Sequence, residues 1–541
     1  MRRITLTIIL LLGSWAIHAQ SFTKADSLRG SITPERAWWD LIYYHLDVEV
    51  FPEEQKIEGS NTIVYQVLKP NDVLQIDLQR PLSISKVVQN GHELDFRREG
   101  HAFFIQLTER QQVNQIYQLE VYYEGKPRRA IRAPWDGGFS WQKDDNGHHF
   151  IATSCQGLGA SVWWPCKDHM YDEVDSMRIS VEVPQELIDV SNGRLEGIDH
   201  NRKKKTKTYH WKVLSPINNY GVNLNIGNYT QWTEVYEGEG GDLDITYWAL
   251  KQDEQKARKQ YVEVPRMLEA FEHWFGPYPF YEDGYQLVQA PYLGMEHQSS
   301  ITYGNQFRNG YLGRDLSGTG WGLKFDFIIV HESGHEWFAN NITHRDIADM
   351  WIHESFTNYS ESLFVEYFFG KAAGQEYVRG TRANIQNQKP MIGNYGVNDE
   401  GYPIDVYYKG GNMLNMLRTL LGDDEKWRKM LRALGKEFYH TTTNSAAVEQ
   451  FISRYLELDL LKFFDQYLRD PRVPVLEYYF QDGKFNYRWT NVINDFVMSV
   501  DVVLGSDEVR LTVQTTWSRL ETKATTLEID RNYYIGVLKS R

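Results

Sequence analysis

Apolar and polar residues follow three successive patterns along the chain. From about Tyr43 to Tyr236, short runs such as YYHLDVEVF and YQLEVYYEG alternate apolar and polar side chains between turn residues, which predicts β-strands. From about Lys251 the apolar residues recur at helical spacing, as in VPRMLEAFEHWF and GNMLNMLRTLL. Beyond Pro471 and Pro474 the alternation returns, in VLEYYF and EVRLTVQTTW. We therefore expect a multidomain α+β protein with an all-β domain, a mostly helical domain and a small C-terminal β-sandwich.

Length and pattern together predict the domain boundaries. A chain of 541 residues is long enough for three or four domains. We expect a signal peptide over 1–20, the N-terminal all-β domain over 21–245, the helical domain over 246–470 and the β-sandwich over 471–541.

Two of the expected helices are long. LKFDFIIVHESGHEWFANNI lies in a helix predicted to begin near Trp321, and EQFISRYLELDLLKFFDQYL is predicted as another helix. The adjacent glycines Gly410 and Gly411 are interpreted as a turn or a helix start, because no nucleotide-binding glycine loop surrounds them.

The net charge argues against a nucleic-acid partner. The chain carries a formal charge of -14, and an acidic surface repels phosphate. The one dense basic run, RKKKTK over 202–207, is flanked by polar residues and is predicted as a solvated hairpin tip rather than a binding patch.

The first residues are typical of a signal peptide. MRRITLTIILLLGSWAIHAQ has two arginines, a short apolar stretch and a small residue before Gln20, so we expect cleavage after Ala19 and a periplasmic or secreted protein. An uncleaved anchor is the alternative. No later segment has about 18 consecutive apolar residues, so no transmembrane segment is expected in the mature chain.

Only two cysteines occur, Cys155 and Cys166. An oxidising compartment would permit a bridge between them, and two buried free thiols are the alternative.

A metal site is indicated by the segment VHESGHE. His331 and His335 are four residues apart, which places both imidazoles on one face of a helix, one turn apart. Zinc accepts imidazole nitrogen and carboxylate oxygen, and a catalytic zinc needs three protein ligands with one position open to water. Glu332 lies between the two histidines, where it can take a proton from that water.

The third ligand is predicted at Glu354, in the segment MWIHESF. Eighteen residues separate it from His335, which is enough for the end of one helix, a loop and the start of another. A carboxylate there can return beside the first helix and complete a set for one zinc ion per chain.

Several segments together resemble the M1 metallopeptidase family, the aminopeptidase N and leukotriene-A hydrolase group. HESGHEWFANNIT resembles the family pattern HExxHxWxGN, DMWIHESFTNY resembles WLNEGFA, LGMEHQSS resembles GxMEN, and YYKG resembles YxKG. The likeness also includes SCQGLGASVWWPCKD and spans roughly residues 40–541. It implies a saddle-shaped all-β domain followed by a thermolysin-like catalytic domain. One departure from the family is expected: about 70 residues follow Pro471, enough for the small β domain but not for the large helical domain that many members carry.

The resemblance implies how a peptide would bind. Glu296 would bind the free α-amino group of the substrate, a charge-assisted contact that only a chain N-terminus can supply. Gln156 would contact the same N-terminal residue, and the backbone of Gly294 and Met295 would lie along the substrate as a strand edge. His297 stands where the family usually has Asn, a difference that would alter the local hydrogen bonding or titrate with pH.

The resemblance also implies an oxyanion donor. Tyr407, identified by the Lys-Gly that follows Tyr408, would donate a hydrogen bond to the oxyanion that forms in the transition state. Asp349 and Glu336 would orient the ligand imidazoles.

The function predicted from all of these residues is a zinc aminopeptidase acting on peptides with a free N-terminus. Three alternatives remain: a non-catalytic peptide-binding protein on the same scaffold, an epoxide-opening enzyme, and an endopeptidase, against which Glu296 argues. Serine- and cysteine-nucleophile schemes lack their motifs.

Overall fold

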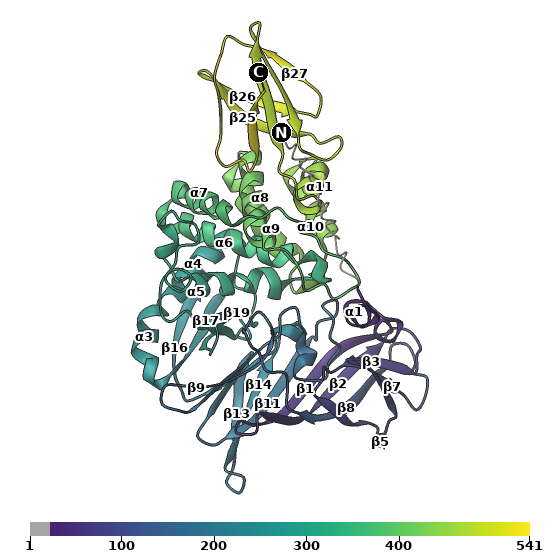
Figure 1. The fold of residues 1–541 in the computed structure, drawn as a ribbon. Coiled ribbons are helices and arrows are strands. Elements are labelled where there is room, and N and C mark those ends of the chain that lie inside the picture. Colours follow the sequence, from purple (N-terminus) through teal and green to yellow (C-terminus); the bar gives the residue numbers. More distant parts are fainter. Residues whose placement is uncertain (1–21, 541) are drawn as a thin grey trace, which may run out of the picture.

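A computed structural model describes residues 22–540. β-Strands make up the N-terminal region, helices gather in the middle of the molecule, and a second β-rich region stands at the opposite end (Figure 1). The expected α+β fold class is confirmed. The expected signal peptide lies outside the described residues.

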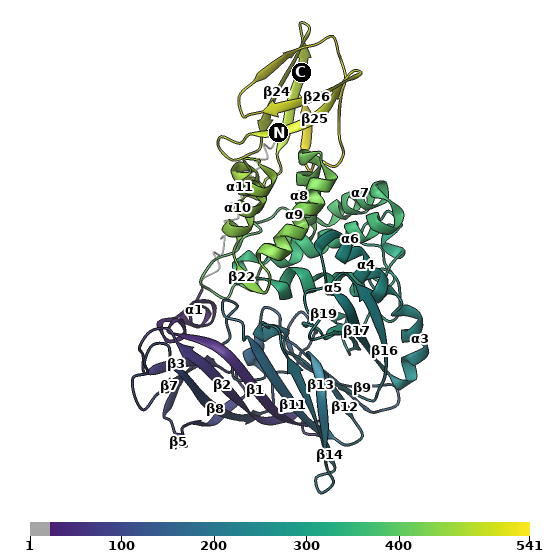
Figure 2. The same ribbon diagram turned by 180° about the vertical axis from the view of Figure 1, so that it is seen from behind.

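The N-terminal region is built on an eight-stranded sheet. Its strand order is β13-β14-β11-β1-β2-β8-β4-β5. The strands are β1 Trp39–Phe51, β2 Lys56–Val67, β4 Ser83–Gln89, β5 His92–Glu93, β8 Ile116–Gly125, β11 Ser176–Pro184, β13 Arg194–Asn201 and β14 Thr206–Val213. The basic run 202–207 forms the exposed tip of the β13–β14 hairpin and the start of β14, as expected. Figure 2 shows this sheet from behind.

Two smaller sheets and two short helices complete this region. One sheet has the order β3-β7-β6 and the other β12-β15-β10-β9. Their strands are β3 Val73–Asp77, β6 Phe96–Glu99, β7 Ala102–Gln106, β9 Gly138–Lys143, β10 His149–Ser154, β12 Ile188–Ser191 and β15 Leu224–Gly227; the helices are α1 Lys24–Gly30 and α2 Pro34–Ala37. Strand β10 ends two residues before Gln156, so the sheet that contains β10 positions Gln156.

A five-stranded sheet joins the β region to the helices. Its order is β16-β17-β18-β20-β19, which leaves β19 at one edge. The strands are β16 Tyr229–Gly238, β17 Gly241–Leu250, β18 Tyr285–Gln289, β19 Gly294–Met295 and β20 Ile301–Tyr303. The helices are α3 Glu254–Gln260, α4 Glu263–Phe275, α5 Phe327–Gly334, α6 Trp351–Phe369, α7 Lys371–Gly380, α8 Asp405–Leu421, α9 Asp424–Glu437, α10 Ser445–Leu456 and α11 Leu461–Arg469.

The C-terminal region consists of two small sheets, ordered β27-β24-β23-β29 and β26-β25-β28. The strands are β23 Val475–Gln481, β24 Lys484–Thr490, β25 Met498–Leu504, β26 Asp507–Val513, β27 Ser518–Glu521, β28 Leu527–Ile529 and β29 Gly536–Lys539. Their inner faces bury alternate residues. In β25, for example, Met498, Val500, Val502 and Leu504 are buried and the residues between them are partly exposed.

Two of the long predicted helices are interrupted. Helix α5 begins at Phe327, where Asp326 caps it, and it ends at Gly334; 336–341 forms a wide turn in which Phe338 and Ala339 leave helical backbone angles. The second predicted helix is divided into α10 and α11 because Glu457, with φ +60°, adopts the left-handed conformation that terminates helices.

Cys155 and Cys166 are buried free thiols. Burial raises the pKa of both, so neither is poised as a nucleophile. Within residues 22–540, no helix has the length and apolar character needed to cross a bilayer.

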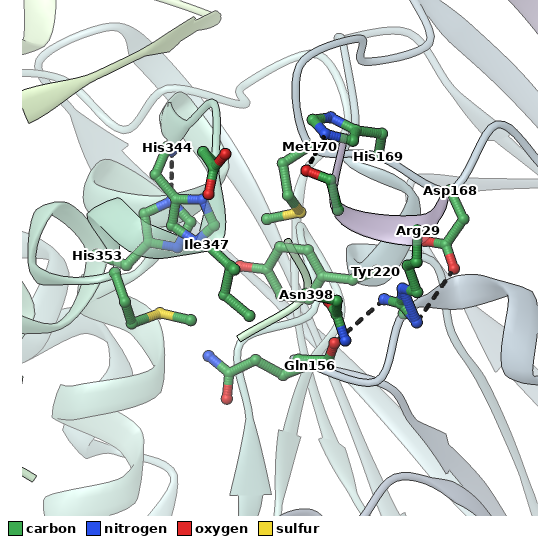
Figure 3. Close-up of a pocket in the computed structure, with 15 residues that line it drawn as sticks. Arg29, Gln156, Asp168, His169, Met170, Tyr220, His344, Ile347, His353 and Asn398 are labelled. Atoms are coloured by element: carbon green, nitrogen blue, oxygen red, sulfur yellow. Dashed lines mark hydrogen bonds and ion pairs between the residues drawn. The ribbon is translucent and has the colours of Figure 1, made fainter. Parts of the chain in front are cut away.

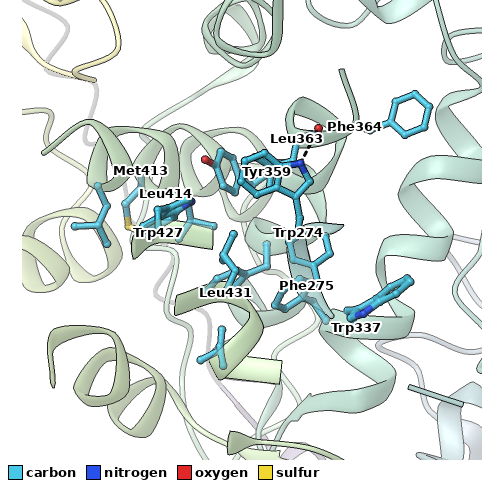
Figure 4. Close-up of a cluster of buried hydrophobic side chains, with 14 of the residues drawn as sticks. Trp274, Phe275, Trp337, Tyr359, Leu363, Phe364, Met413, Leu414, Trp427 and Leu431 are labelled. Carbon is cyan, nitrogen blue, oxygen red and sulfur yellow. Dashed lines mark hydrogen bonds between the residues drawn. The ribbon is translucent and has the colours of Figure 1, made fainter. Parts of the chain in front are cut away.

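The helical region is held together by a continuous apolar core. Side chains from α4, α6, α8 and α9 meet in it (Figure 4). Trp427 and Leu431 of α9 are fully buried against this cluster, and the Trp427 ring meets Tyr359 of α6 edge-on with centroids 6.2 Å apart. This packing holds α6, which carries Glu354, in place.

We expect Leu431→Ala to lower the free energy of unfolding by about 2–5 kcal/mol, because it removes a buried side chain and leaves a cavity. Chemical unfolding followed by far-UV circular dichroism measures the change. Leu461→Ala is the matched control, since Leu461 is 62% exposed; it should change stability by less than about 0.5 kcal/mol. Equal effects of the two substitutions would contradict this description of the core.

Candidate active site

Helix α5 presents the two histidines of the HExxH segment. Asp326 caps the helix by accepting hydrogen bonds from the backbone of Ile328 at 3.1 Å and Ile329 at 3.3 Å. His335 follows the last residue of α5 but keeps a right-handed helical conformation, so it still stands one turn from His331. The two imidazole centroids are 5.0 Å apart.

Glu354, in the first turn of α6, completes the cluster. Its Oε2 lies 3.4 Å from Nε2 of His335 and 3.8 Å from Nε2 of His331. The three ligand atoms all lie within 4.8 Å of one another. The structure therefore brings together the three residues that the sequence predicts as metal ligands.

The protonation of both imidazoles is set from outside the cluster. Nδ1 of His331 lies 2.8 Å from Oε1 of Glu361, and Nδ1 of His335 lies 3.0 Å from the carbonyl oxygen of Phe338 and 3.1 Å from Oγ1 of Thr357. A carboxylate and a carbonyl only accept hydrogen bonds, so each Nδ1 carries a proton and Nε2 is the ring atom that faces the centre.

This arrangement fits one zinc ion. Two imidazole nitrogens and one carboxylate oxygen are a usual zinc donor set with an open fourth position. Oε2 of Glu354 is buried and accepts no hydrogen bond from the described residues, as expected of an oxygen aimed at a cation.

Asp349 and Glu336 do not orient the imidazoles, so that expectation is wrong. Asp349 accepts hydrogen bonds from Tyr395 and Ser445, and Glu336 accepts them from residues that include Tyr278 and Asn340. The orienting carboxylate is Glu361. It lies seven residues after Glu354, two turns along the same face of α6, and that spacing could have identified it.

Glu332 faces the same cavity from α5. One oxygen of Glu332, one of Glu296 and a ring nitrogen of His335 lie within 4.8 Å of one another. Burial, followed by the charge of Glu296, raises the pKa of Glu332. Gly294 permits this approach, because a Cβ at that position would lie 2.9 Å from Oε1 of Glu332.

Glu296 and Gln156 form the polar end of the cavity. Nε2 of Gln156 donates to Oε1 of Glu296 at 2.5 Å and to Oε1 of Glu354 at 3.3 Å. Glu296 is 2% exposed, and burial raises its pKa. The backbone of Gly294 and Met295 forms β19, the edge strand of the five-stranded sheet, and both residues line the cavity.

Tyr407 lies in the first turn of α8, and its hydroxyl donates to Oε1 of Glu354 at 3.0 Å. Gly410 and Gly411 are buried inside α8, not in the turn or at the helix start expected from the sequence. A Cβ on Gly410 would lie 1.8 Å from Oγ of Ser355, and one on Gly411 would lie 2.4 Å from Oδ1 of Asn358. These glycines therefore let α8 approach α6 closely enough for Tyr407 to reach Glu354.

The metal cluster, Glu332, Glu296 and Tyr407 line one cavity of about 460 Å³. A second cavity of about 50 Å³ shares Gln156 with it (Figure 3). Arg29 of α1 borders this second cavity, donates to the Gly157 carbonyl at 3.1 Å and lies 3.7 Å from Asp168. No sequence pattern indicated Arg29, because its partner Gly157 lies 128 residues away along the chain.

A buried His2Glu cluster with an adjacent glutamate, reached from a peptide-sized cavity, defines the class of zinc metallohydrolases whose ligands lie on two consecutive helices. Comparison with known proteins specifies the class further. The Peptidase family M1 domain matches residues 260–467, and the Peptidase M1 N-terminal domain matches residues 41–220. The chain belongs to peptidase family M1.

Individual relatives are distant. Leukotriene A-4 hydrolase of Xenopus laevis is 22% identical over 484 residues, which cover 82% of this chain and 73% of that protein. Probable aminopeptidase 2 of Sulfurisphaera tokodaii is 23% identical over 383 residues, 67% of this chain and 46% of that protein. The chain thus spans about half the length of the latter. A crystal structure of an M1 zinc metallopeptidase from Deinococcus radiodurans is similar, with a TM-score of 0.66, 20% identity and coverage of 78% of this chain and 91% of that chain.

We expect Glu361→Gln to weaken zinc binding by about 10–100-fold, because the amide no longer provides a charged acceptor for Nδ1 of His331. Competition with a chromogenic chelator measures the affinity. Glu457→Gln is the control, since the Glu457 side chain is 83% exposed. Unchanged zinc affinity in Glu361→Gln would show that Glu361 does not support the ligand.

His297 does not titrate in the ordinary pH range, because burial lowers its pKa to about 3. In the unfolded chain the pKa of histidine is about 6.5. The unfolded state therefore binds a proton that the folded state lacks, and His297 destabilises the fold progressively as pH falls from about 6.5 toward 3.

We expect His297→Asn to lose less thermal stability than the wild type between pH 6.5 and 4. Calorimetric melting temperatures across this range measure the difference, with His92→Asn as the control because His92 is exposed. Parallel curves for His297→Asn and the wild type would refute the account.

Proposed function

We propose that this protein is an exported zinc aminopeptidase that removes the N-terminal residue from peptides with a free amino terminus. The observation that carries the proposal is the pairing of a zinc-type ligand cluster with a buried carboxylate, Glu296, in the same cavity. The matches to family M1 and the relatives named as aminopeptidases support it. The signal-peptide pattern of residues 1–20 supports export to the periplasm or beyond.

Recognition of the amino terminus would rest on Glu296 and Gln156. An α-ammonium group beside Glu296 would compensate the negative charge that burial otherwise disfavours, and Gln156 holds the carboxylate in position. A solved M1 zinc metallopeptidase mutant of Deinococcus radiodurans is described as bound to a Tyr-Ser-Ala substrate. That likeness supports peptides as the substrate class here.

A zinc ion held by His331, His335 and Glu354 would supply a Lewis acid for the scissile carbonyl and lower the pKa of water. Glu332 would accept the proton of the attacking water and pass it to the leaving amine. Burial raises the pKa of Glu332, which makes this carboxylate a stronger base than an exposed glutamate.

Tyr407 would stabilise the oxyanion. Burial and the Glu354 carboxylate raise the pKa of Tyr407 well above its usual range, so the hydroxyl keeps its proton and stays a donor. Because charge develops on the carbonyl oxygen only in the transition state, this hydrogen bond would favour the reaction over substrate binding.

We expect Glu332→Gln to lower kcat on aminoacyl chromogenic amides by about 10²–10⁴-fold while zinc content stays at one per chain. Hydrolysis assays and elemental analysis of the same preparations test both points. The wild type should cleave free substrates and leave their N-acetylated counterparts intact.

Other outcomes of these assays would point to a different function. Equal cleavage of acetylated substrates would indicate an endopeptidase. No cleavage by the zinc-loaded wild type, with peptide binding retained, would indicate a binding protein on this scaffold.

A further inference from the structure

One large apolar side chain of the site cavity is unusually exposed. Trp135 lines the cavity together with the metal cluster, yet it is 67% exposed. A tryptophan that stands free in water beside a binding cavity has about 150–250 Å² of surface to offer a ligand.

Hydrogen bonds order the loop that carries Trp135. At its base, Ala130 N donates to Phe139 O at 2.9 Å and Phe139 N donates to Arg128 O at 2.8 Å. Nearer the tip, the backbone of Ile131 donates to Oδ2 of Asp136 at 2.6 Å, and the Trp135 backbone donates to the Arg132 carbonyl at 3.0 Å. Pre-ordering reduces the entropy lost when such a residue contacts a ligand.

The loop lies at the amino-recognition end of the cavity. It leads into β9, whose first residue, Gly138, pairs with Ser154 at the end of β10, two residues before Gln156. Gly137 packs on the next part of the same segment, since a Cβ there would lie 2.9 Å from Cδ2 of Leu158.

Aromatic side chains also line the cavity. Tyr311, Tyr402 and Tyr408 are among its lining residues, together with Met295 and Trp135.

The side chain of a bound peptide's first residue has limited space available to it. Its Cα would lie between the amino group at Glu296 and the carbonyl at the metal cluster. The cavity on the other side of Gln156 has only about 50 Å³, room for a few water molecules and well below the roughly 150 Å³ of a cavity that binds benzene. The larger cavity of about 460 Å³, whose lining includes Met295, Tyr402 and Trp135, is the space that remains for this side chain.

We propose that Trp135 is a specificity-determining residue that covers the side chain of the substrate's first residue and selects large apolar or aromatic N-terminal residues. The proposal rests on the function proposed above for its assignment of the amino-binding end. Trp135 would recognise the side chain by dispersion and by burial of apolar surface against one face of its indole ring. Such recognition does not require a deep closed pocket.

The test measures binding of free L-phenylalanine and L-alanine to zinc-loaded protein by isothermal titration calorimetry, so it does not depend on catalysis. We expect the wild type to prefer phenylalanine by about 10-fold or more. Trp135→Ala should remove most of this preference, and Trp135→Phe should retain it. Ile131→Ala is the matched control: Ile131 is 87% exposed on the same loop but lines a separate hollow with Arg129 and Trp141.

An unchanged phenylalanine-to-alanine ratio in Trp135→Ala, or equal binding of both amino acids by the wild type, would overturn the proposal. An equal loss of affinity for both ligands in Trp135→Ala would also overturn it, because the loop would then shape the site without discriminating between side chains. The same variants assayed on phenylalanyl and alanyl chromogenic amides separate the two proposals. Discrimination in binding without any hydrolysis would support the role of Trp135 and reject the aminopeptidase.

Discussion

Three buried carboxylates crowd one cavity, and the rest of the site depends on how their charge is balanced. Glu296, Glu332 and Glu354 are each at most 8% exposed. Like charges at this separation and burial repel strongly unless cations or hydrogen-bond donors accompany them. Burial alone disfavours a charged His335, yet the carboxylates around it raise its pKa to about 10. A cavity this negative favours a divalent cation at one end and an ammonium group at the other.

Three close approaches between backbone elements make the crowding possible. Gly294 brings the edge strand against Glu332, and Gly410 with Gly411 brings α8 against α6. Gly334 does the same between α5 and α6, since a Cβ there would lie 2.8 Å from Oγ of Ser360. At each position any larger residue would separate elements whose side chains must share a metal or a substrate, which is a packing reason for glycine rather than a conformational one.

The substrate end of the cavity is assembled from both sides of the boundary between the β region and the helical region. Glu296 and Tyr407 come from the helical side, whereas Gln156 and Trp135 come from the β side. Arg29 also connects α1 to this end of the cavity, because it donates a hydrogen bond to the carbonyl of Gly157 beside Gln156. In the proposed function the β region would therefore contribute directly to substrate recognition, in addition to supporting the five-stranded sheet.

The sequence by itself determined the fold class, and it singled out the three residues that the structure brings together as a candidate metal cluster, because these follow from residue spacing and from the likeness of several segments to family M1. Two-residue alternation reports a half-buried strand, and histidines four residues apart share a helix face whether or not the helix ends at Gly334. The partners that orient His331, the interior position of Gly410 and the contacts of Arg29 were decided only by the tertiary structure. Each depends on contacts between elements far apart in the chain, which local periodicity does not encode. The same is true of His297: its residue type suggests a pH switch, but complete burial keeps it neutral.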